Sequence, residues 1–393
     1  MPARNEMTSK ERILRTIEWK DVDHLPLTLN GICHTCMVDI NKKLNWDQFK
    51  IADYFRELGT DTGISVYVPV TLSPHVEEKY SIRQVPGEKD DILFKEYITP
   101  KGRLAQAVRK NAHYPYNYIS LFSDHLVPPG RSYKYMIDSP NELDMLEDIL
   151  GDPDEAAFSE SREYARAAKK YANERGIVLT AYNEGIGDPL LWLSGLNNIV
   201  FMGADEPEAL GRYVDILSRW NMRYIEIMLD MGVDIILRRG WYECSDFWSP
   251  ERYRRFLLPA LKKEVEFTHN AGAKYGYIMN SGVDALADLI VESGVDMQTN
   301  AEPLKNNFIG LRKTFQNKVA MCSGINNYKV IEAGGETDIE NAFFYAVENY
   351  APGGGFILAP SDSIGGIGLS NDKISEKNIK NAHFLVETWK KYI

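Results

Sequence analysis

The chain has 393 residues, of which 44% are hydrophobic and 26% are charged, and this is ordinary usage for a globular protein with a large core. Its formal net charge is −11, whereas a protein that neutralises phosphates needs clustered Lys and Arg. The composition therefore excludes a disordered chain and disfavours binding to nucleic acid or to an anionic membrane surface.

The first predicted elements are a helix and two strands. Thr8 precedes an amphipathic run with Glu11 three residues later, which is the spacing of a capping box and predicts a helix at the N-terminus. An apolar strand follows at 24–31, and a strand at 63–69 comes after a predicted helix over 47–58. The chain thus begins with a helical extension ahead of its first strand.

The region from about 75 to 136 interrupts this order. Residues 80–108 alternate in character around Pro100-Lys101-Gly102, which predicts an inserted antiparallel hairpin. Residues 109–136 are rich in Tyr and Pro and show neither the helical nor the strand periodicity of apolar residues. We therefore expect a loop or cap over one end of the fold.

The remainder alternates regularly between strands and helices. The predicted strands are 177–183, 234–239, 274–279, 296–300, 318–324 and 354–360, and the predicted helices are 155–175, 205–231, 250–271, 283–293 and 337–349. With the first two, this makes eight core strands and predicts an α/β fold, a (β/α)8 TIM barrel formed by residues 1–393 as one domain. A Rossmann fold is disfavoured because the first strand is not followed by GxGxxG.

The active site of such a barrel lies at the carboxyl ends of its strands, so the polar residues there are the candidates. Glu184 ends a strand and is a candidate for chemistry, with a helix cap as its alternative role. Arg238 and Arg239 suit an anionic group, or else a structural ion network. The candidates for substrate binding are Asn30, His34, Tyr67, Asn183, Arg239, Trp241, Met279, Asn300 and Asp362.

The cysteines and the N-terminus indicate the compartment. Four cysteines at 33, 36, 244 and 322 are too few and too scattered for a disulfide framework, and one Cys-x-x-Cys pair is weak support for zinc. The chain has neither the pattern of a signal peptide nor an apolar run long enough for a membrane span. We expect a cytoplasmic enzyme.

Three blocks carry a resemblance to a known family. They are TSKERILRTIEWKDVDHLPL near the start, FWSPERYRRFLLPALKKEVEFTHNAGAKYGYIMNSG in the middle and GGGFILAPSDSIG near the end. Together they resemble the uroporphyrinogen decarboxylase superfamily over essentially the whole chain, most thinly between residues 70 and 150. The resemblance implies the same barrel and a homodimer.

Two departures from the family pattern narrow the expected activity. Decarboxylases of the family place arginines soon after the first strand, and LNGICHTCMVDI contains none. Thiol-methylating members carry His-x-Cys where this chain has Met279-Asn280-Ser281, and a further Cys where it has Ser361 or Asp362. The usual zinc ligands are therefore absent, and a thiol substrate is disfavoured.

The resemblance then implies a corrinoid-dependent methyltransferase. Such an enzyme would take a methyl group from a small methoxylated aromatic, with O-demethylation of that donor, and pass it to the Co(I) corrinoid (cobalamin) of a separate carrier protein. The leaving oxygen needs a proton or a Lewis acid. Glu184, Tyr182 and Asp188 are the candidates for the proton. A relocated metal, with zinc as the open alternative, would use Glu243, Cys244 and Cys322.

Two other functions stay open from the sequence. One is a decarboxylase or other lyase acting on a carboxylated aromatic or a tetrapyrrole, with Arg238 or Arg239 holding the carboxylate. The other is a non-catalytic barrel that binds a corrinoid or tetrapyrrole. The aromatic residues after the strands, among them Tyr67 and Tyr182, favour a flat apolar ligand in each case.

Overall fold

A parallel barrel forms the centre of the protein. The computed structural model describes residues 7–32, 36–126, 130–151, 155–365 and 374–393. One seven-stranded parallel sheet has the order β1-β6-β7-β8-β9-β10-β11. Its strands are β1 (Gly63–Val66), β6 (Val178–Asn183), β7 (Ile235–Arg239), β8 (Lys274–Ile278), β9 (Met297–Thr299), β10 (Ala320–Ile325) and β11 (Phe356–Pro360).

The segment at 27–28 closes this sheet into a barrel. Leu27 forms a parallel bridge with Leu358 of β11, and Thr28 forms one with Asp61, just before β1. The segment therefore occupies the eighth position between the two edges of the sheet. The (β/α)8 barrel predicted from the sequence is confirmed, although the first strand is reduced to these bridges.

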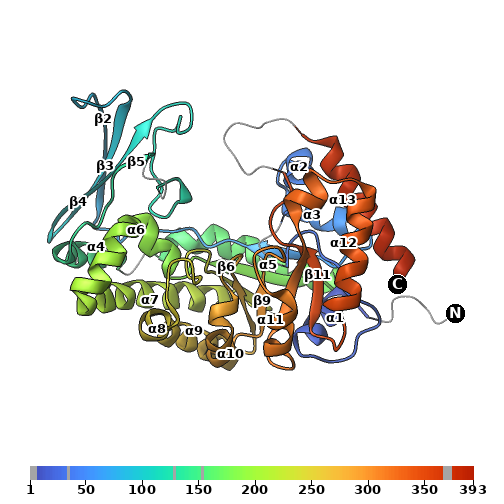
Figure 1. Cartoon of the computed structure of the whole chain (residues 1–393). Coiled ribbons are helices and arrows are strands. Elements are labelled where there is room, and N and C mark those ends of the chain that lie inside the picture. The colour runs from blue at the N-terminus through green and yellow to red at the C-terminus, as the bar shows by residue number, and fades with distance from the viewer. Residues whose placement is uncertain (1–6, 33–35, 127–129, 152–154, 366–373) are drawn as a thin grey trace.

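Helices surround the barrel and cover its lower end (Figure 1). Thr8 and Glu11 form the predicted capping box. Ile13 and Ile17 of the first helix belong to the apolar cluster inside the barrel, so this helix covers the N-terminal ends of the strands. The helices are α1 (Ser9–Ile17), α2 (Val38–Lys43), α3 (Gln48–Glu57), α4 (Leu143–Ile149), α5 (Ser159–Arg175), α6 (Gly187–Asp205), α7 (Pro207–Asp230), α8 (Pro250–Arg252), α9 (Leu258–Asn270), α10 (Ala287–Ser293), α11 (Phe308–Phe315), α12 (Glu336–Asn349) and α13 (Glu376–Tyr392).

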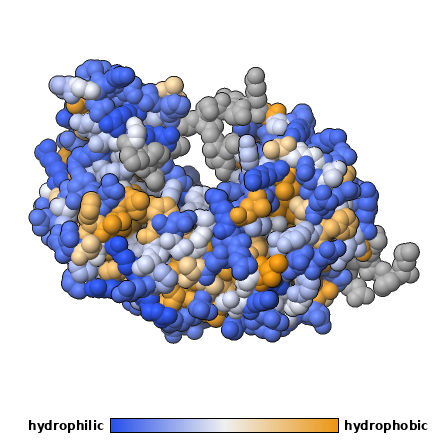
Figure 2. All heavy atoms as spheres, in the orientation of Figure 1, coloured by the Kyte–Doolittle hydropathy of each residue, from blue (hydrophilic) through white to orange (hydrophobic). Residues whose placement is uncertain are grey.

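The inserted region forms a four-stranded antiparallel sheet. It stands apart from α2 and α13 on the same side of the barrel (Figure 1), and the surface between them is hollowed (Figure 2). The predicted hairpin is β3 with β4, but two further strands flank it. The sequence did not predict β2, because most of its residues are exposed and the strand has no buried face. The strands are β2 (Glu77–Arg83), β3 (Asp91–Thr99), β4 (Gly102–Lys110) and β5 (Ser132–Lys134).

A small apolar cluster holds the segment after β4 against this sheet. Leu93 and Val108 of the sheet pack with Tyr114, Ile119 and Leu126. The segment therefore has a core of its own, although it lacks a regular period. Among the described residues, none of the helices has the combination of length and apolar character that crossing a membrane requires.

Two glycines allow the first strand to approach β1. A Cβ added to Gly63 would lie 2.6 Å from the carbonyl oxygen of Gly31 and 2.9 Å from Cγ2 of Val178. We expect Gly63→Ala to lower the free energy of unfolding by about 1–3 kcal/mol, because neither backbone can yield without opening the barrel.

Gly211→Ala is the matched control, measured in the same urea titrations. Its added Cβ would meet nothing within 4 Å in α7, so we expect a gain of about 0.5–1 kcal/mol from helix propensity. Equal stability of the two variants would contradict the close approach.

Candidate active site

Strand β7 points its side chains alternately into the barrel and out toward the helices. Ile235 and Leu237 belong to the apolar cluster inside the barrel, and Ile236 belongs to the cluster between the sheet and the helices. By the same alternation Arg238 points outward and Arg239 points inward. The two adjacent arginines therefore have different surroundings.

Arg239 gathers three carboxylates at the carboxyl end of the barrel. Its guanidinium lies 3.0 Å from Glu184 and 3.0 Å from Asp124, and its Nε lies 3.6 Å from Asp188. Glu184 follows β6, and Asp188 lies in the first turn of α6. Asp124 belongs to a short 3-10 helix of the inserted region, so this region contributes to the mouth of the barrel.

Two tryptophans hold this guanidinium in place. The carbon at its centre lies 4.8 Å from the ring centre of Trp192 and 4.4 Å from that of Trp241. The indole nitrogen of Trp192 also donates a hydrogen bond of 2.7 Å to Asp124. Arg239 is thus fixed on its faces by rings and at its edges by carboxylates.

Burial favours the protonated form of two of these carboxyl groups. Asp188 is fully buried, and burial raises its pKa to about 8, with Arg239 opposing the shift. Its Oδ1 accepts a hydrogen bond of 2.8 Å from the backbone N–H of Tyr242, and its Oδ2 has no hydrogen-bond partner among the described residues. Burial also raises the pKa of Glu184, whose side chain is 25% exposed. Glu184 is therefore the more accessible acid of the two.

A cavity of about 540 Å³ lies beside this cluster of charges. Burial, and after it the carboxylate of Glu184, raise the pKa of Tyr67, which lines this cavity. Glu184 therefore acts electrostatically on the lining. Of the predicted candidates, Asn30, Tyr67 and Tyr182 line it. The other described lining residues are Gly31, Cys36, Asn41, Trp46, Gln48, Ser65, Val66, Tyr164 and Ser363.

Three predicted substrate ligands instead support the framework. The Asn183 side chain is buried and accepts a hydrogen bond of 2.7 Å from the N–H of Gly185. Met279 is fully buried in the layer between sheet and helices. Asn300 is fully buried, has a φ of 69°, and donates 3.1 Å to the carbonyl of Ser361. None of the three lines the cavity.

The remaining predicted ligands are Asp362 and His34. Asp362 accepts a hydrogen bond of 3.3 Å from the side-chain amide of Asn280. Burial raises the pKa of Asp362, while hydrogen bonds from Ser363 and Asn280 oppose the shift. His34 lies outside the described residues.

The outward Arg238 forms a fully buried network. It donates hydrogen bonds of 2.6 Å and 2.8 Å to Glu243 and one of 2.6 Å to Glu264 of α9. The phenols of Tyr277 and Tyr275 donate to the same two carboxylates. The structural ion network considered for Arg238 is therefore what the fold contains.

The three residues considered for a relocated metal do not come together. Both oxygens of Glu243 accept from Arg238, and its Oε1 also accepts from two backbone N–H groups. Cys322 lies in the apolar interior of the barrel, and Cys244 lies 3.6 Å from Asp246. The described residues contain no group of three or more His, Cys, Asp or Glu side chains arranged to hold a metal ion. The sequence-based metal assignment is thus corrected.

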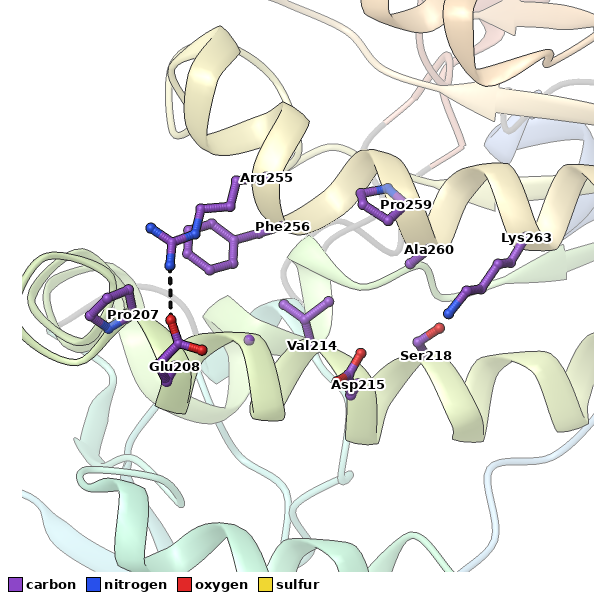
Figure 3. Close-up of a pocket in the computed structure, with 11 residues that line it drawn as sticks. Pro207, Glu208, Val214, Asp215, Ser218, Arg255, Phe256, Pro259, Ala260 and Lys263 are labelled. Carbon is purple, nitrogen blue, oxygen red and sulfur yellow. Dashed lines mark hydrogen bonds and ion pairs between the residues drawn. The ribbon is translucent and has the colours of Figure 1, made fainter.

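A second hollow lies outside the barrel, between α7 and α9 (Figure 3). It has a volume of about 240 Å³, and Arg255 spans it to Glu208 at 3.1 Å. None of the residues that follow the strands lines it. The mouth of the barrel is the better candidate because it combines the larger cavity with the buried acids.

Sequence reasoning missed several residues of this site. Asp124 lies in the segment without a regular period, and no local pattern marks it. Asn41, Trp46 and Gln48 belong to the connection after the first strand, as the predicted barrel would allow. Tyr164 comes from α5 and reaches the cavity only through packing, so its position needed the tertiary structure.

Comparison with known proteins gives the family. The model described as "Uroporphyrinogen decarboxylase (URO-D)" matches residues 193–391, which is slightly more than half of the chain. The chain belongs to the uroporphyrinogen decarboxylase family. This match confirms the resemblance found in the sequence, and no curated protein matches the chain.

Two solved structures are compared with this URO-D family chain. A methyltransferase from Methanosarcina mazei is 14% identical, with 98% of this chain and 99% of that chain covered and a TM-score of 0.61. A D-psicose 3-epimerase with D-tagatose from Clostridium cellulolyticum H10 is 13% identical, with 66% and 94% covered and a TM-score of 0.38. At 14% identity, the likeness to the methyltransferase shows a common fold.

The buried network predicts a large cost for losing Arg238. We expect Arg238→Met to lower the free energy of unfolding by about 3–5 kcal/mol, because two buried carboxylates lose their cation. Urea denaturation measures the change, and Arg254→Met, which breaks an exposed pair with Glu292, is the control that should change little. A loss no larger than the control's would contradict the role of the network.

The raised pKa of Asp188 predicts a pH-dependent stability. Between about pH 4 and 8 the folded state keeps a proton that the unfolded chain releases, so this group destabilises the fold as pH rises. We expect Asp188→Asn to gain stability relative to the natural protein as pH increases across this window. Urea midpoints at about pH 5 and about pH 8 test this, with the exposed Asp215→Asn as the control. A difference that is independent of pH would contradict the assignment.

Proposed function

We propose that this URO-D family protein is a methyltransferase that takes a methyl group from a methoxylated aromatic and passes it to the Co(I) corrinoid of a separate carrier protein. The observation that carries the proposal is Glu184, a carboxyl group of raised pKa that acts electrostatically on Tyr67 in the lining of an aromatic cavity. The likeness in fold to a methyltransferase over nearly the whole chain supports it.

The aromatic lining suits the ring of such a donor. Trp46, Tyr67, Tyr164 and Tyr182 line the cavity, and rings provide stacking area at a small entropic cost. The volume of about 540 Å³ is in the range of small-molecule sites. In this proposal the donor stacks on these rings at the carboxyl end of the barrel.

Glu184 would act as the general acid. Burial favours its protonated form, so it can give a proton to the ether oxygen as the bond from that oxygen to the methyl carbon breaks. The donor leaves as a neutral phenol, and Co(I) of the corrinoid supplies the electron pair that accepts the methyl group. Arg239, 3.0 Å from Glu184, then stabilises the carboxylate that remains.

Asp188 would act as a positioning residue. It is fully buried behind Arg239 and accepts from the backbone of Tyr242, so it fixes the guanidinium and does not face the cavity. Tyr182 lines the cavity and would contact the donor directly. The proposal uses no metal on the protein, because the described residues do not assemble a set of ligands.

The test is transfer to a reduced corrinoid carrier. With methoxyaromatic donors and the Co(I) carrier, we expect the corrinoid spectrum to change only when the enzyme is present. Glu184→Gln should slow this change on the order of a hundredfold, which is the usual share of a general acid. For the natural enzyme, the rate should fall as pH rises through the pKa of Glu184, since only the protonated form donates.

An exposed carboxylate of α12 provides the control. Glu348→Gln removes an exposed carboxylate from α12 and should leave the rate unchanged. If no donor methylates the corrinoid while a carboxylated aromatic loses CO2 without the carrier, the protein is a decarboxylase and the proposal fails.

A further inference from the structure

The described residues that line the cavity carry no charged side chain. None of the described residues that line it is Asp, Glu, Lys, Arg or His. Its polar groups are the amides of Asn30, Asn41 and Gln48 and the hydroxyls of serines and tyrosines. A ligand carboxylate would therefore lose its water without gaining a cation from these residues.

The guanidinium of Arg239 is already paired with carboxyl groups of the protein. Three carboxylates surround Arg239, at 3.0 Å, 3.0 Å and 3.6 Å. Of these three groups, Glu184 acts electrostatically on Tyr67 of the lining. A ligand carboxylate would have to displace one of these groups to reach the guanidinium, so the surroundings offer it no free cation.

One lining side chain requires a hydrogen-bond donor. Asn41 is 3% exposed, and its amide nitrogen donates 3.4 Å to Asn30. Its Oδ1 is buried and has no hydrogen-bond partner among the described residues. An unpaired buried acceptor costs free energy, and a hydroxyl group on a ligand would supply the missing hydrogen bond.

We infer that the methyl donor is a methoxylated phenol without a carboxylate, whose hydroxyl donates to Asn41. The inference rests on the proposed function, and it specifies the substrate class of the same cavity. Aromatic rings hold the arene, the amide of Asn41 accepts from its hydroxyl, and the lack of a cation in the described lining disfavours an acid in its place.

Direct binding tests the inference without methyl transfer. Calorimetric titration of the full chain near neutral pH compares 2-methoxyphenol, methoxybenzene and 4-hydroxy-3-methoxybenzoate. We expect 2-methoxyphenol to bind on the order of tenfold more tightly than either of the others.

Asn41→Leu tests the hydrogen bond. This variant should lose the preference for 2-methoxyphenol over methoxybenzene while it still binds methoxybenzene, which also shows that it is folded. Asn349→Leu is the matched control, because this exposed amide lies in α12 outside the cavity and its nitrogen donates 2.9 Å to the carbonyl of Tyr345. It should keep the preference.

The outcomes separate the inference from the proposed function. Binding of the benzoate as tight as that of the phenol, or no binding of any of the three, overturns the inference. Methyl transfer from the benzoate alone overturns it too, and leaves the methyltransferase proposal standing. Preferential binding of the phenol without methyl transfer to the carrier supports the inference about the cavity and overturns the proposed function.

Discussion

The buried pairing of Arg238 with Glu243 and Glu264 is the interaction on which the mouth of the barrel depends. Glu243 also accepts hydrogen bonds of 2.9 Å and 2.7 Å from the N–H groups of Ile186 and Gly187. One carboxylate thus joins β7 to the beginning of α6, the helix that carries Asp188. Because a buried charge without its partner is strongly unfavourable, this turn has little freedom to move.

The rigid turn explains how acids and aromatic rings coexist at the mouth. Glu184 is held between the end of β6 and α6, where burial favours its proton and Arg239 limits the shift. The inserted sheet completes the arrangement through Asp124, since its small core fixes the segment that bears this residue. The barrel and the insertion therefore build the site together.

The sequence predicted the barrel well because its signals are local. The capping box at Thr8 and the strand that places Arg238 and Arg239 on opposite sides follow from short-range patterns. Asn183 and Met279, which were predicted as ligands, lie in the framework, because strand ends carry framework residues as well as ligands. Asp124 could not have been found, since only contacts distant in the sequence bring it to Arg239.

The alternation along β7 also bears on how a barrel of this kind acquires new substrates. Of two consecutive residues, Arg238 binds the surrounding helix α9 and Arg239 lies at the mouth of the barrel. A substitution at 239 therefore changes the groups that a ligand contacts, while Arg238 still holds the helix in place. Selection, or a protein engineer, can therefore vary the mouth at inward positions without breaking the network of Arg238. Retargeting the enzyme calls for changes at inward positions and in the connection after the first strand, with every outward neighbour left intact.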